Sequence, residues 1–404
     1  MNRHRIISLL AAAALMLTMA GCGDGDSSAS SSKGEVTPPN GSETAVDFKT
    51  GTDGSARVKV NGTDFEVGGK KLWLNGANAP WINWNDFGGS FSFMEWNEHF
   101  KALHDSGINC ARVWISCNGE VGMDIDEDGN FKGATEQHWK DLSELFSIAE
   151  ANQVYIMATV QSFDHYKDDE NVDNSQEKFS AWRKLIQDGA KTDSYINNYI
   201  VPLVKTFGKS DYFFSVDLCN EPDWIFENSE CGNIEWEHLS AYYAKAAAAI
   251  HANSDVLVTV GLGMPKYNSD KIQGNKISNG YLQSFIEEGP GYSKELAFVD
   301  FYSTHWYPWE EGSGMGNPFK QTPEEFGLDT DRPTVIGECP GTPTKMTLAE
   351  EYKAAYDLGY DGVLAWKTSG QNDGNGLIDD ISPATKEMKE KYEEEIFPLG
   401  FLAA

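Results

Sequence analysis

Beyond Ile6–Met19 the sequence has no long hydrophobic run, and throughout it has few basic residues. The 404 residues include 32 Lys and Arg against 62 Asp and Glu, a formal net charge of −30. A surface of that sign repels phosphate backbones and anionic headgroups, which excludes nucleic acid and an electrostatically held membrane as partners. Without a further apolar stretch of about 20 residues, no transmembrane helix is predicted. This composition suits an uncharged substrate.

Several chemical motifs are also missing from the sequence. No glycine-rich phosphate loop follows the first predicted strand, which argues against an open dinucleotide-binding sheet. No Gly-x-Ser-x-Gly element marks a nucleophile elbow, so an esterase or serine protease is not favoured. No His-Cys cluster has the spacing of zinc ligands, and we expect neither a cofactor nor a metal.

Cysteine is scarce: six are present, and five remain once Cys22 is set aside. An odd number outside the cytosol leaves at least one thiol free. The pairs Cys110–Cys117 and Cys219–Cys231 are both conceivable, and the sequence favours neither. Two of the five cysteines adjoin the acidic residues discussed below, but strand alternation is expected to point their thiols away from the face that those acids share.

The segment before residue 46 is predicted to be an export signal and a tether. Arg3 and Arg5 precede the apolar run Ile6–Met19, and Ala20-Gly21-Cys22 follows, as in a bacterial lipobox. We expect residues 1–21 to be removed and Cys22 to carry lipid; an ordinary signal peptide cleaved nearby is the alternative. Residues 22–45, rich in Ser, Gly, Asp and Pro, are expected to be flexible. The protein is therefore predicted to be extracytoplasmic, on a bacterial cell surface or membrane, and to touch that membrane only through its anchor.

Residues 46–404 indicate one α/β domain. Eight apolar or β-branched runs predict strands at Leu72–Gly76, Asn109–Ile115, Val154–Val160, Phe213–Leu218, Val256–Val260, Val299–Thr304, Thr334–Ile336 and Gly362–Ala365. Helical patterns separate them, as at Trp96–Ser106, Trp139–Asn152, Ile234–Asn253 and Leu348–Gly359. Eight strands alternating with helices predict a (β/α)8 TIM barrel, with an open doubly wound sheet as the alternative. Ala56–Phe65, centred on Asn61-Gly62, predicts a small N-terminal β-hairpin.

Polar and aromatic residues gather where the predicted strands end, the place that carries the chemistry of such barrels. They are, in chain order, Asn78, Trp81, Trp84, Arg112, Trp114, Gln161, Asp164, His165, Asn220, Glu221, Trp224, His305, Tyr307, Glu338 and Trp366. Each is a weak signal alone. Together they predict one site.

Two carboxylates, Glu221 and Glu338, follow the fourth and seventh strands, nearly opposite each other in a closed barrel. Such a pair suits double displacement on a glycoside, in which one group attacks the anomeric carbon and the other protonates the leaving oxygen. Glu221 is expected to be the acid/base, its pKa raised by apolar surroundings and a neighbouring charge. Glu338 is expected to be the nucleophile, kept ionised by Arg112 and the Tyr307 hydroxyl. Asn220 is placed to hold the sugar 2-hydroxyl.

These motifs carry a family resemblance. The run Asp217-Leu218-Cys219-Asn220-Glu221-Pro222, then His305-Trp306-Tyr307, Ile336-Gly337-Glu338 and Trp366, resembles glycoside hydrolase family 5 over roughly residues 56–398. The resemblance implies a retaining (β/α)8 hydrolase with Glu221 as acid/base and Glu338 as nucleophile. It also implies that Trp366 is a sugar-stacking platform and that the site is supported by Arg112, Asn220, His305 and Tyr307. Many members have a histidine after the third strand, where this chain has Gln161, with His165 beyond it.

Tryptophans near the strand ends predict a long cleft that grips several sugar rings. Trp81, Trp114 and Trp224 are expected to contact substrate together with Trp366. This favours endo action on an uncharged β-1,4-linked polysaccharide, and the segments around Arg112 and His305 look closer to mannanases than to cellulases. The chain is thus predicted to be a monomeric retaining endo-β-1,4-mannanase. A cellulase of the same family and a non-catalytic glycan-binding surface lipoprotein are the alternatives.

Two acidic loops invite comparison with calcium sites. The loop 124–136 begins Asp124-x-Asp126-x-Asp128-Gly129-Asn130, but its twelfth position is Thr135 instead of Glu. The loop 372–380 carries Asn372-Asp373-Gly374-Asn375-Gly376 and then two further aspartates. A polar turn is the simpler account of each loop, so no metal site is predicted.

Overall fold

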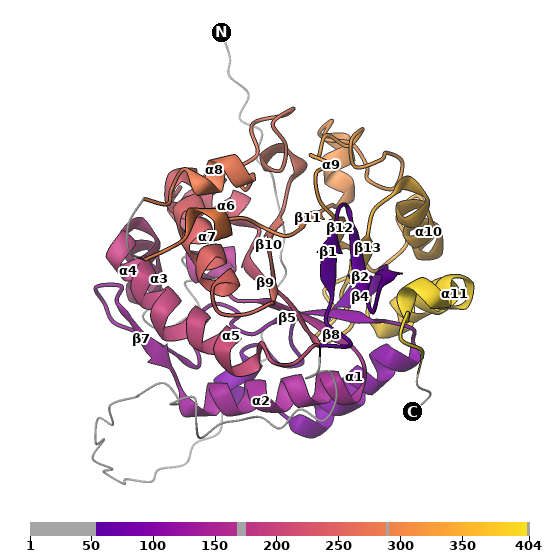
Figure 1. Ribbon diagram of the computed structural model, residues 1–404, viewed down its shortest axis with the longest axis horizontal. Coiled ribbons are helices and arrows are strands. Elements are labelled where there is room, and N and C mark those ends of the chain that lie inside the picture. The colour runs from indigo at the N-terminus through magenta and orange to yellow at the C-terminus, as the bar shows by residue number, and fades with distance from the viewer. Residues whose placement is uncertain (1–53, 168–174, 288–290, 402–404) are drawn as a thin grey trace. The chain divides into compact units, whose positions relative to one another are not determined.

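The computed structural model describes residues 54–167, 175–287 and 291–401 (Figure 1). The predicted signal, residues 1–21, and the predicted tether, residues 22–45, lie outside these ranges. Within them, no helix combines the length and the apolar character needed to cross a membrane.

Eight parallel strands close into a barrel, which confirms the predicted (β/α)8 fold and not the open sheet. In barrel order they are β4 (Leu74–Asn78), β5 (Cys110–Trp114), β8 (Tyr155–Thr159), β9 (Phe213–Asn220), β10 (Leu257–Leu262), β11 (Tyr302–His305), β12 (Thr334–Pro340) and β13 (Gly362–Trp366). Each overlaps one predicted strand. Because the strands are parallel, their carboxyl ends share one rim, called here the C-terminal rim.

Helices surround the strands, as Figure 1 shows for α2, α5, α10 and α11. Their bounds are α1 (Phe93–Asp105), α2 (Glu136–Ala151), α3 (Ser175–Gln187), α4 (Gly189–Tyr195), α5 (Val201–Phe207), α6 (Pro222–Glu227), α7 (Trp236–His251), α8 (Asn279–Gln283), α9 (Pro308–Gly312), α10 (Leu348–Leu358) and α11 (Ile378–Ile396). The four predicted helices are α1, α2, α7 and α10. Capping residues made the ends of α10 predictable from the sequence. Thr347 and Glu350 form a capping box at its start, and Gly359 ends it with φ 89°.

The predicted hairpin is a three-stranded antiparallel sheet of β1 (Lys59–Asn61), β2 (Asp64–Val67) and β3 (Lys70–Leu72). The second turn was missed: Gly68 and Gly69 have φ of 58° and 77°, the backbone that a tight hairpin turn needs. Leu72 therefore belongs to β3, and the first barrel strand begins two residues later than predicted, at Leu74.

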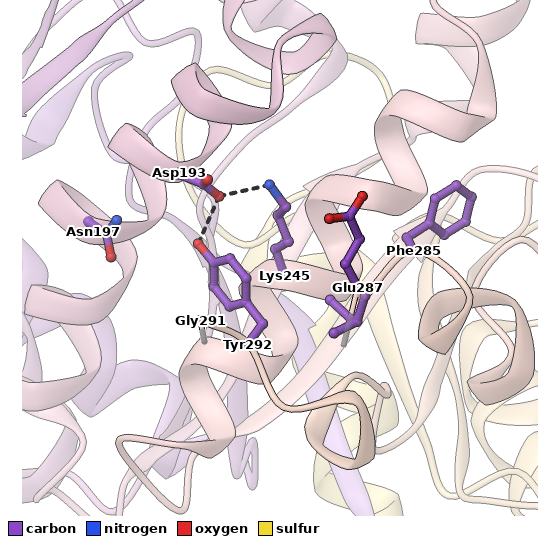
Figure 2. Close-up of a pocket in the computed structure, with 8 residues that line it drawn as sticks. Asp193, Asn197, Lys245, Phe285, Glu287, Gly291 and Tyr292 are labelled. Carbon is purple, nitrogen blue, oxygen red and sulfur yellow. Dashed lines mark hydrogen bonds and ion pairs between the residues drawn. The ribbon is translucent and has the colours of Figure 1, made fainter. Parts of the chain in front are cut away.

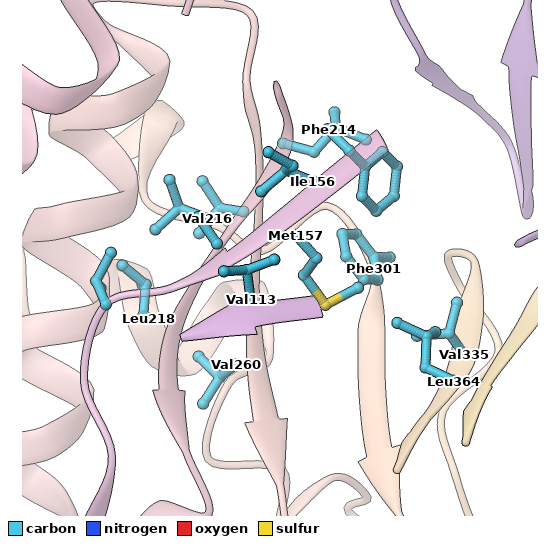
Figure 3. Close-up of a cluster of buried hydrophobic side chains, with 14 of the residues drawn as sticks. Val113, Ile156, Met157, Phe214, Val216, Leu218, Val260, Phe301, Val335 and Leu364 are labelled. Atoms are coloured by element: carbon cyan, nitrogen blue, oxygen red, sulfur yellow. The ribbon is translucent and has the colours of Figure 1, made fainter. Parts of the chain in front are cut away.

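Side chains alternate across the barrel wall. Val113, Val216 and Val335 point outward into the apolar core between strands and helices (Figure 3). Asp217, next to Val216, instead lies inside the barrel, where it contacts Arg112. The barrel interior can therefore carry a polar network while its outer surface packs against the helices.

The cysteines of the described residues are all free and buried: Cys110, Cys117, Cys219, Cys231 and Cys339. Neither conceivable disulfide is formed. Cys219 and Cys339 belong to the apolar core, so both thiols point away from the acids beside them, as expected. For Cys219 the cause is a break in alternation, because the pairing of β9 with β10 slips between Thr259 and Gly261.

Candidate active site

Glu221 stands where β9 passes into α6. Its φ and ψ are 49° and 56°, in the left-handed region that residues other than glycine seldom adopt. Its backbone N–H donates to the Gly261 carbonyl at 2.7 Å, and Pro222 starts the helix directly afterwards. A strained backbone held in this way is common at functional sites.

Glu338 lies in β12 with both carboxylate oxygens engaged. Arg112 Nη1 donates to Oε1 at 2.6 Å, and the Tyr307 hydroxyl donates to Oε2 at 3.0 Å. Arg112 is fully buried and Glu338 is 4% exposed, so water competes little for these bonds. The carboxylate is therefore fixed in orientation and paired with a cation.

The two glutamates are close together. A carboxyl oxygen of each, and a ring nitrogen of His305, all lie within 4.8 Å of one another. His305 Nδ1 is 3.0 Å from Glu221 Oε1 and 3.6 Å from Glu338 Oε1. Retaining glycosidases hold their carboxyl groups about 5–5.5 Å apart and inverting ones about 6.5–9.5 Å apart. The short separation suits the retaining geometry.

Arg112 is the hub of a buried polar network inside the barrel. Its Nε donates to Asp217 Oδ2 at 2.8 Å, Nη2 to Asn220 Oδ1 at 2.9 Å, and Nη1 to Asn78 Oδ1 at 3.1 Å. A Cβ on Gly261 would lie 3.0 Å from Arg112 Nη2, so only glycine leaves room for this arrangement. Asn78 was among the residues predicted to gather here, whereas the sequence interpretation missed Asp217 and Gly261 as parts of the site. Their signal was weak, because a lone polar residue within a strand does not reveal which side of the barrel wall it faces.

The two carboxyl groups differ in the neighbours that oppose the effect of burial. Burial raises the pKa of Glu221 to about 7, against the opposing effects of Arg112 and of Trp224, whose Nε1 donates to Oε2 at 3.1 Å. Burial also raises the pKa of Glu338, but His305, Arg112 and the Tyr307 hydroxyl oppose that rise. Since Glu338 has the direct guanidinium contact, the proton of the pair is expected on Glu221. Burial lowers the pKa of His305 to about 4, so its imidazole is neutral at pH 7.

The predicted tryptophans lie at the C-terminal rim in two groups. Trp81, Trp84, Trp114 and Trp366 pack together with ring centroids 4.7–6.4 Å apart, and Trp114 lies 5.9 Å from the Arg112 guanidinium. Trp224 pairs with Trp309 at 6.2 Å, beside Glu221. Trp84 and Trp309 are 42% and 41% exposed, whereas Trp366 is 9% exposed.

Of the predicted residues after β8, Asp164 lies near enough for the charge of Glu221 to raise its pKa, which burial raises most, to about 6, whereas Gln161 and His165 contact other groups. His165 is buried, with Nε2 3.1 Å from Ser116 Oγ and Nδ1 accepting from the Ser162 backbone N–H. Gln161 accepts from the Tyr166 hydroxyl at 2.7 Å, on the core side of the wall. The family's histidine therefore has no counterpart here among the described residues that touch the carboxylate pair.

The first acidic loop is the turn between β6 (Met123–Ile125) and β7 (Phe131–Ala134). Asp126 accepts from the Asn130 backbone N–H at 2.8 Å and pairs with Lys132 Nζ at 2.8 Å. The Lys132 contact holds the pKa of Asp126 well below its usual range. The loop therefore forms the polar turn that was the simpler interpretation.

A separate cavity of about 510 Å³ opens beside α4 and α7, lined in part by Asp193, Lys245 and Tyr292 (Figure 2). Lys245 Nζ and the Tyr292 hydroxyl both lie 2.9 Å from Asp193 Oδ1. Neither Glu221 nor Glu338 lines this cavity. It is not part of the candidate active site.

The closed barrel and the carboxylate pair at its C-terminal rim define a (β/α)8 glycoside hydrolase. Among curated proteins, the chain is 27% identical to a mannan endo-1,4-β-mannosidase of Cryptopygus antarcticus over 78% of this chain and 85% of the relative. It is 25% identical to a mannan endo-1,4-β-mannosidase of Mytilus edulis over 80% of this chain and 90% of the relative. No family model matches the chain.

Solved structures of mannanases share the fold. The endo-1,4-β-mannanase from Eisenia fetida superposes with a TM-score of 0.71 at 21% identity, covering 82% of this chain and 95% of that one. A glycoside hydrolase family 5 mannosidase from Rhizomucor miehei gives a TM-score of 0.54 at 13% identity, covering 84% and 99%. These likenesses show that the chain shares the barrel fold of solved mannanases, one of them a member of glycoside hydrolase family 5.

Proposed function

We propose that the protein is a retaining endo-β-1,4-mannanase. The observation that carries the mechanism is the approach of the Glu221 and Glu338 carboxyl oxygens to within 4.8 Å. The curated relatives, both named as mannan endo-1,4-β-mannosidases, favour mannan over cellulose and favour catalysis over mere capture.

In the first step, the ionised Glu338 carboxylate attacks the anomeric carbon while Glu221 gives its proton to the departing glycosidic oxygen. The bond from the anomeric carbon to that oxygen breaks and an ester to Glu338 forms. Arg112 and Tyr307 hold Glu338 in place for this attack. The aglycone part of the chain then leaves.

In the second step, Glu221 takes a proton from water, and the water oxygen attacks the anomeric carbon from the face that the aglycone left. The ester breaks and Glu338 becomes a carboxylate again. Esterification has removed the negative charge next to Glu221, so the pKa of Glu221 falls and the group becomes a base when a base is needed. Two inversions leave the configuration unchanged.

Substrate contacts are assigned to the rim. The Trp366 indole, backed by Trp81 and Trp114, offers a stacking surface, and Trp224 flanks the acid/base. The Asn220 carbonyl oxygen accepts from Arg112, which leaves its amide NH2 group to donate to the sugar 2-hydroxyl.

The test is reducing-end release from linear mannan, glucomannan, xylan and carboxymethyl cellulose by the purified protein, Glu221→Ala and Glu338→Ala. We expect mannan cleavage that both variants lose. On an aryl β-mannobioside with a good leaving group, Glu221→Ala should still form the glycosyl-enzyme, because that leaving group needs no proton, and azide should then speed turnover. Glu338→Ala should not form the intermediate. Cleavage of cellulose alone would overturn the mannan assignment, and full activity in Glu338→Ala would overturn the mechanism.

We further infer that the protein is exported as a monomeric lipoprotein, with residues 1–21 removed, Cys22 acylated and residues 22–45 as the tether. The order of basic, apolar and Ala-Gly-Cys segments supports this. In a bacterial host, Cys22→Ala should move the protein from the membrane fraction to the soluble fraction. Equal membrane retention of the variant would contradict the anchor.

A further inference from the structure

The second acidic loop, between β13 and α11, contacts the N–H edge of the Trp366 ring. Trp366 Nε1 donates to Asp373 Oδ2 at 2.9 Å, and Lys367 Nζ lies 3.0 Å from that same oxygen. One carboxylate oxygen thus serves both the indole N–H and the neighbouring ammonium group. Neither contact takes part in the two proposed catalytic steps.

Hydrogen bonds within the loop orient the Asp373 carboxylate. Its other oxygen, Oδ1, accepts from the Asn375 backbone N–H at 3.1 Å, and Asn372 Oδ1 accepts from the Gly374 N–H at 2.8 Å. The end of β12 packs closely against the loop: a Cβ on Gly341 would lie 2.5 Å from the Trp366 carbonyl oxygen and 2.7 Å from that of Asn375. Each oxygen of the Asp373 carboxylate therefore has a hydrogen-bond donor, and the backbone on either side of the loop is closely packed.

Lys367 gives Asp373 a second structural role, that of counter-ion. Its side chain is 4% exposed, and Nζ lies 5.1 Å from the Trp81 ring centroid and 5.7 Å from that of Trp366. An ammonium group buried between two indoles needs a counter-ion, and Asp373 supplies it. Both indoles are thereby held around one ion pair.

We propose that Asp373 is a positioning residue for the sugar-stacking platform: it fixes the Trp366 ring through the indole N–H before substrate binds. The inference rests on the proposed function, in which Trp366 stacks on the sugar. Pre-set geometry lowers the ordering cost of binding and of reaching the transition state. Asp373 itself touches no reacting atom.

A double-mutant cycle tests whether Asp373 acts through the indole N–H of Trp366. The cycle is run in a Lys367→Met background, which removes the buried ammonium group that would otherwise lose its counter-ion. There Asp373→Ala should lower kcat/KM on mannohexaose about tenfold, while Asp373→Asn, which keeps an acceptor for the indole N–H, should lose much less. With Trp366→Phe added to that background, which keeps a ring but has no N–H, Asp373→Ala should cost less than about twofold. Asp379→Ala, which removes an exposed carboxylate nearby, is the matched control and should leave kcat/KM unchanged. Equal losses in both backgrounds, or an Asn variant as impaired as the Ala variant, would overturn the proposal.

A second readout does not need substrate. In 15N-labelled protein the Trp366 indole N–H, assigned by its absence from Trp366→Phe, should shift in Asp373→Ala and exchange with solvent at least about tenfold faster, because its acceptor is gone. An unchanged Trp366 signal would overturn the inference even if mannan is cleaved. Absence of glycan cleavage by the wild type, with the indole shift present, would instead refute the proposed function alone.

Discussion

The two glutamates of the rim differ in what each one contacts. Glu338 has a guanidinium group at 2.6 Å and a hydroxyl at 3.0 Å, whereas Glu221 has an indole N–H and a neutral imidazole. Neutral donors stabilise a carboxylate less than a cation does. The same residue type can therefore act as nucleophile in one place and as acid in the other.

This difference predicts a pH profile. Glu221 must carry its proton to act as acid, and its pKa is about 7, so kcat/KM should fall about tenfold per pH unit above pH 7. Rates on mannan oligosaccharides between pH 5 and pH 9 measure this limb. Glu221→Gln cannot lose a proton there, so its residual rate should stay flat over the same range. A wild-type rate that is level up to pH 9 would contradict the assignment.

At the scale of the elements, irregular pairing of the barrel strands brings the side chains of the site together. Between β11 and β12 the register passes from Thr304↔Ile336 to His305↔Glu338. The pairing of β9 with β10 contains a similar shift in register. Each slip places one extra residue on one strand and changes which side chain faces the barrel interior. Asp217, Asn220 and Glu221 reach the site in this way although simple alternation would not place all three there.

The same slips in strand pairing explain why only part of the site could be predicted from the sequence. The eight strands were predictable because each is an apolar run bounded by turns, and the glutamates were predictable because they follow two of those runs. Strict alternation contains no bulges, so it could not show that Asn220, three residues after Asp217, also faces Arg112 inside the barrel. His165 was weighed for its place in the chain, but its contacts with Ser116 and Ser162 depend on a fold of the loop that no local pattern encodes.

Substitution of Gly261 in β10 tests how closely the Arg112 network is packed. In Gly261→Ala the new Cβ would lie 2.9 Å from His305 Nε2, 3.0 Å from Arg112 Nη2 and 3.2 Å from Asp217 Oδ2, all of them buried. We expect a loss of about 1–3 kcal/mol in the free energy of unfolding, from overpacking. We also expect kcat/KM to fall about 100-fold, because the groups that orient both glutamates must move. Urea unfolding and steady-state rates measure the two effects.

Gly280, in α8, provides the control for that substitution. A Cβ there would meet nothing within 4 Å, so Gly280→Ala should leave the rate unchanged and stabilise the helix slightly. If Gly261→Ala were as active and as stable as Gly280→Ala, the close packing of the Arg112 network would be refuted.

On the scale of the whole molecule, acidic groups are spread over two environments. Most contribute to a solvated surface that gives the net charge of −30. A few are buried behind the acid/base: Asp223 Oδ2 accepts from the Gly263 N–H at 2.7 Å, and Glu310 Oε1 accepts from the Tyr307 N–H at 2.8 Å. The second oxygen of each has no hydrogen-bond partner among the described residues. Such groups favour the protonated form.

The buried acids predict that stability depends on pH in the direction opposite to ordinary acid denaturation. Burial, with the charges of Glu221 and Asp223 adding to it, raises the pKa of Glu310 to about 9, and burial raises that of Asp223 to about 8. Between the unfolded pKa, near 4.5 for Glu310, and these folded values, the folded chain binds more protons than the unfolded chain. The free energy of unfolding must therefore fall as pH rises across that range, by at most about 1.4 kcal/mol per pH unit for each group.

Glu310→Gln isolates this effect, because the amide keeps the acceptor for the Tyr307 N–H but has no proton to lose. Thermal unfolding of the wild type should show a Tm that declines from pH 5 to pH 9, and the variant should show a shallower decline and a higher Tm at pH 9. Glu311, one residue along α9, is partly exposed and paired with Lys320 and Lys345, so Glu311→Gln should keep the wild-type slope. Parallel pH slopes for the wild type and Glu310→Gln would mean that Glu310 is ionised in the folded protein. In that case a negative charge would lie behind Glu221, and that charge would add to burial in raising the pKa of the acid/base.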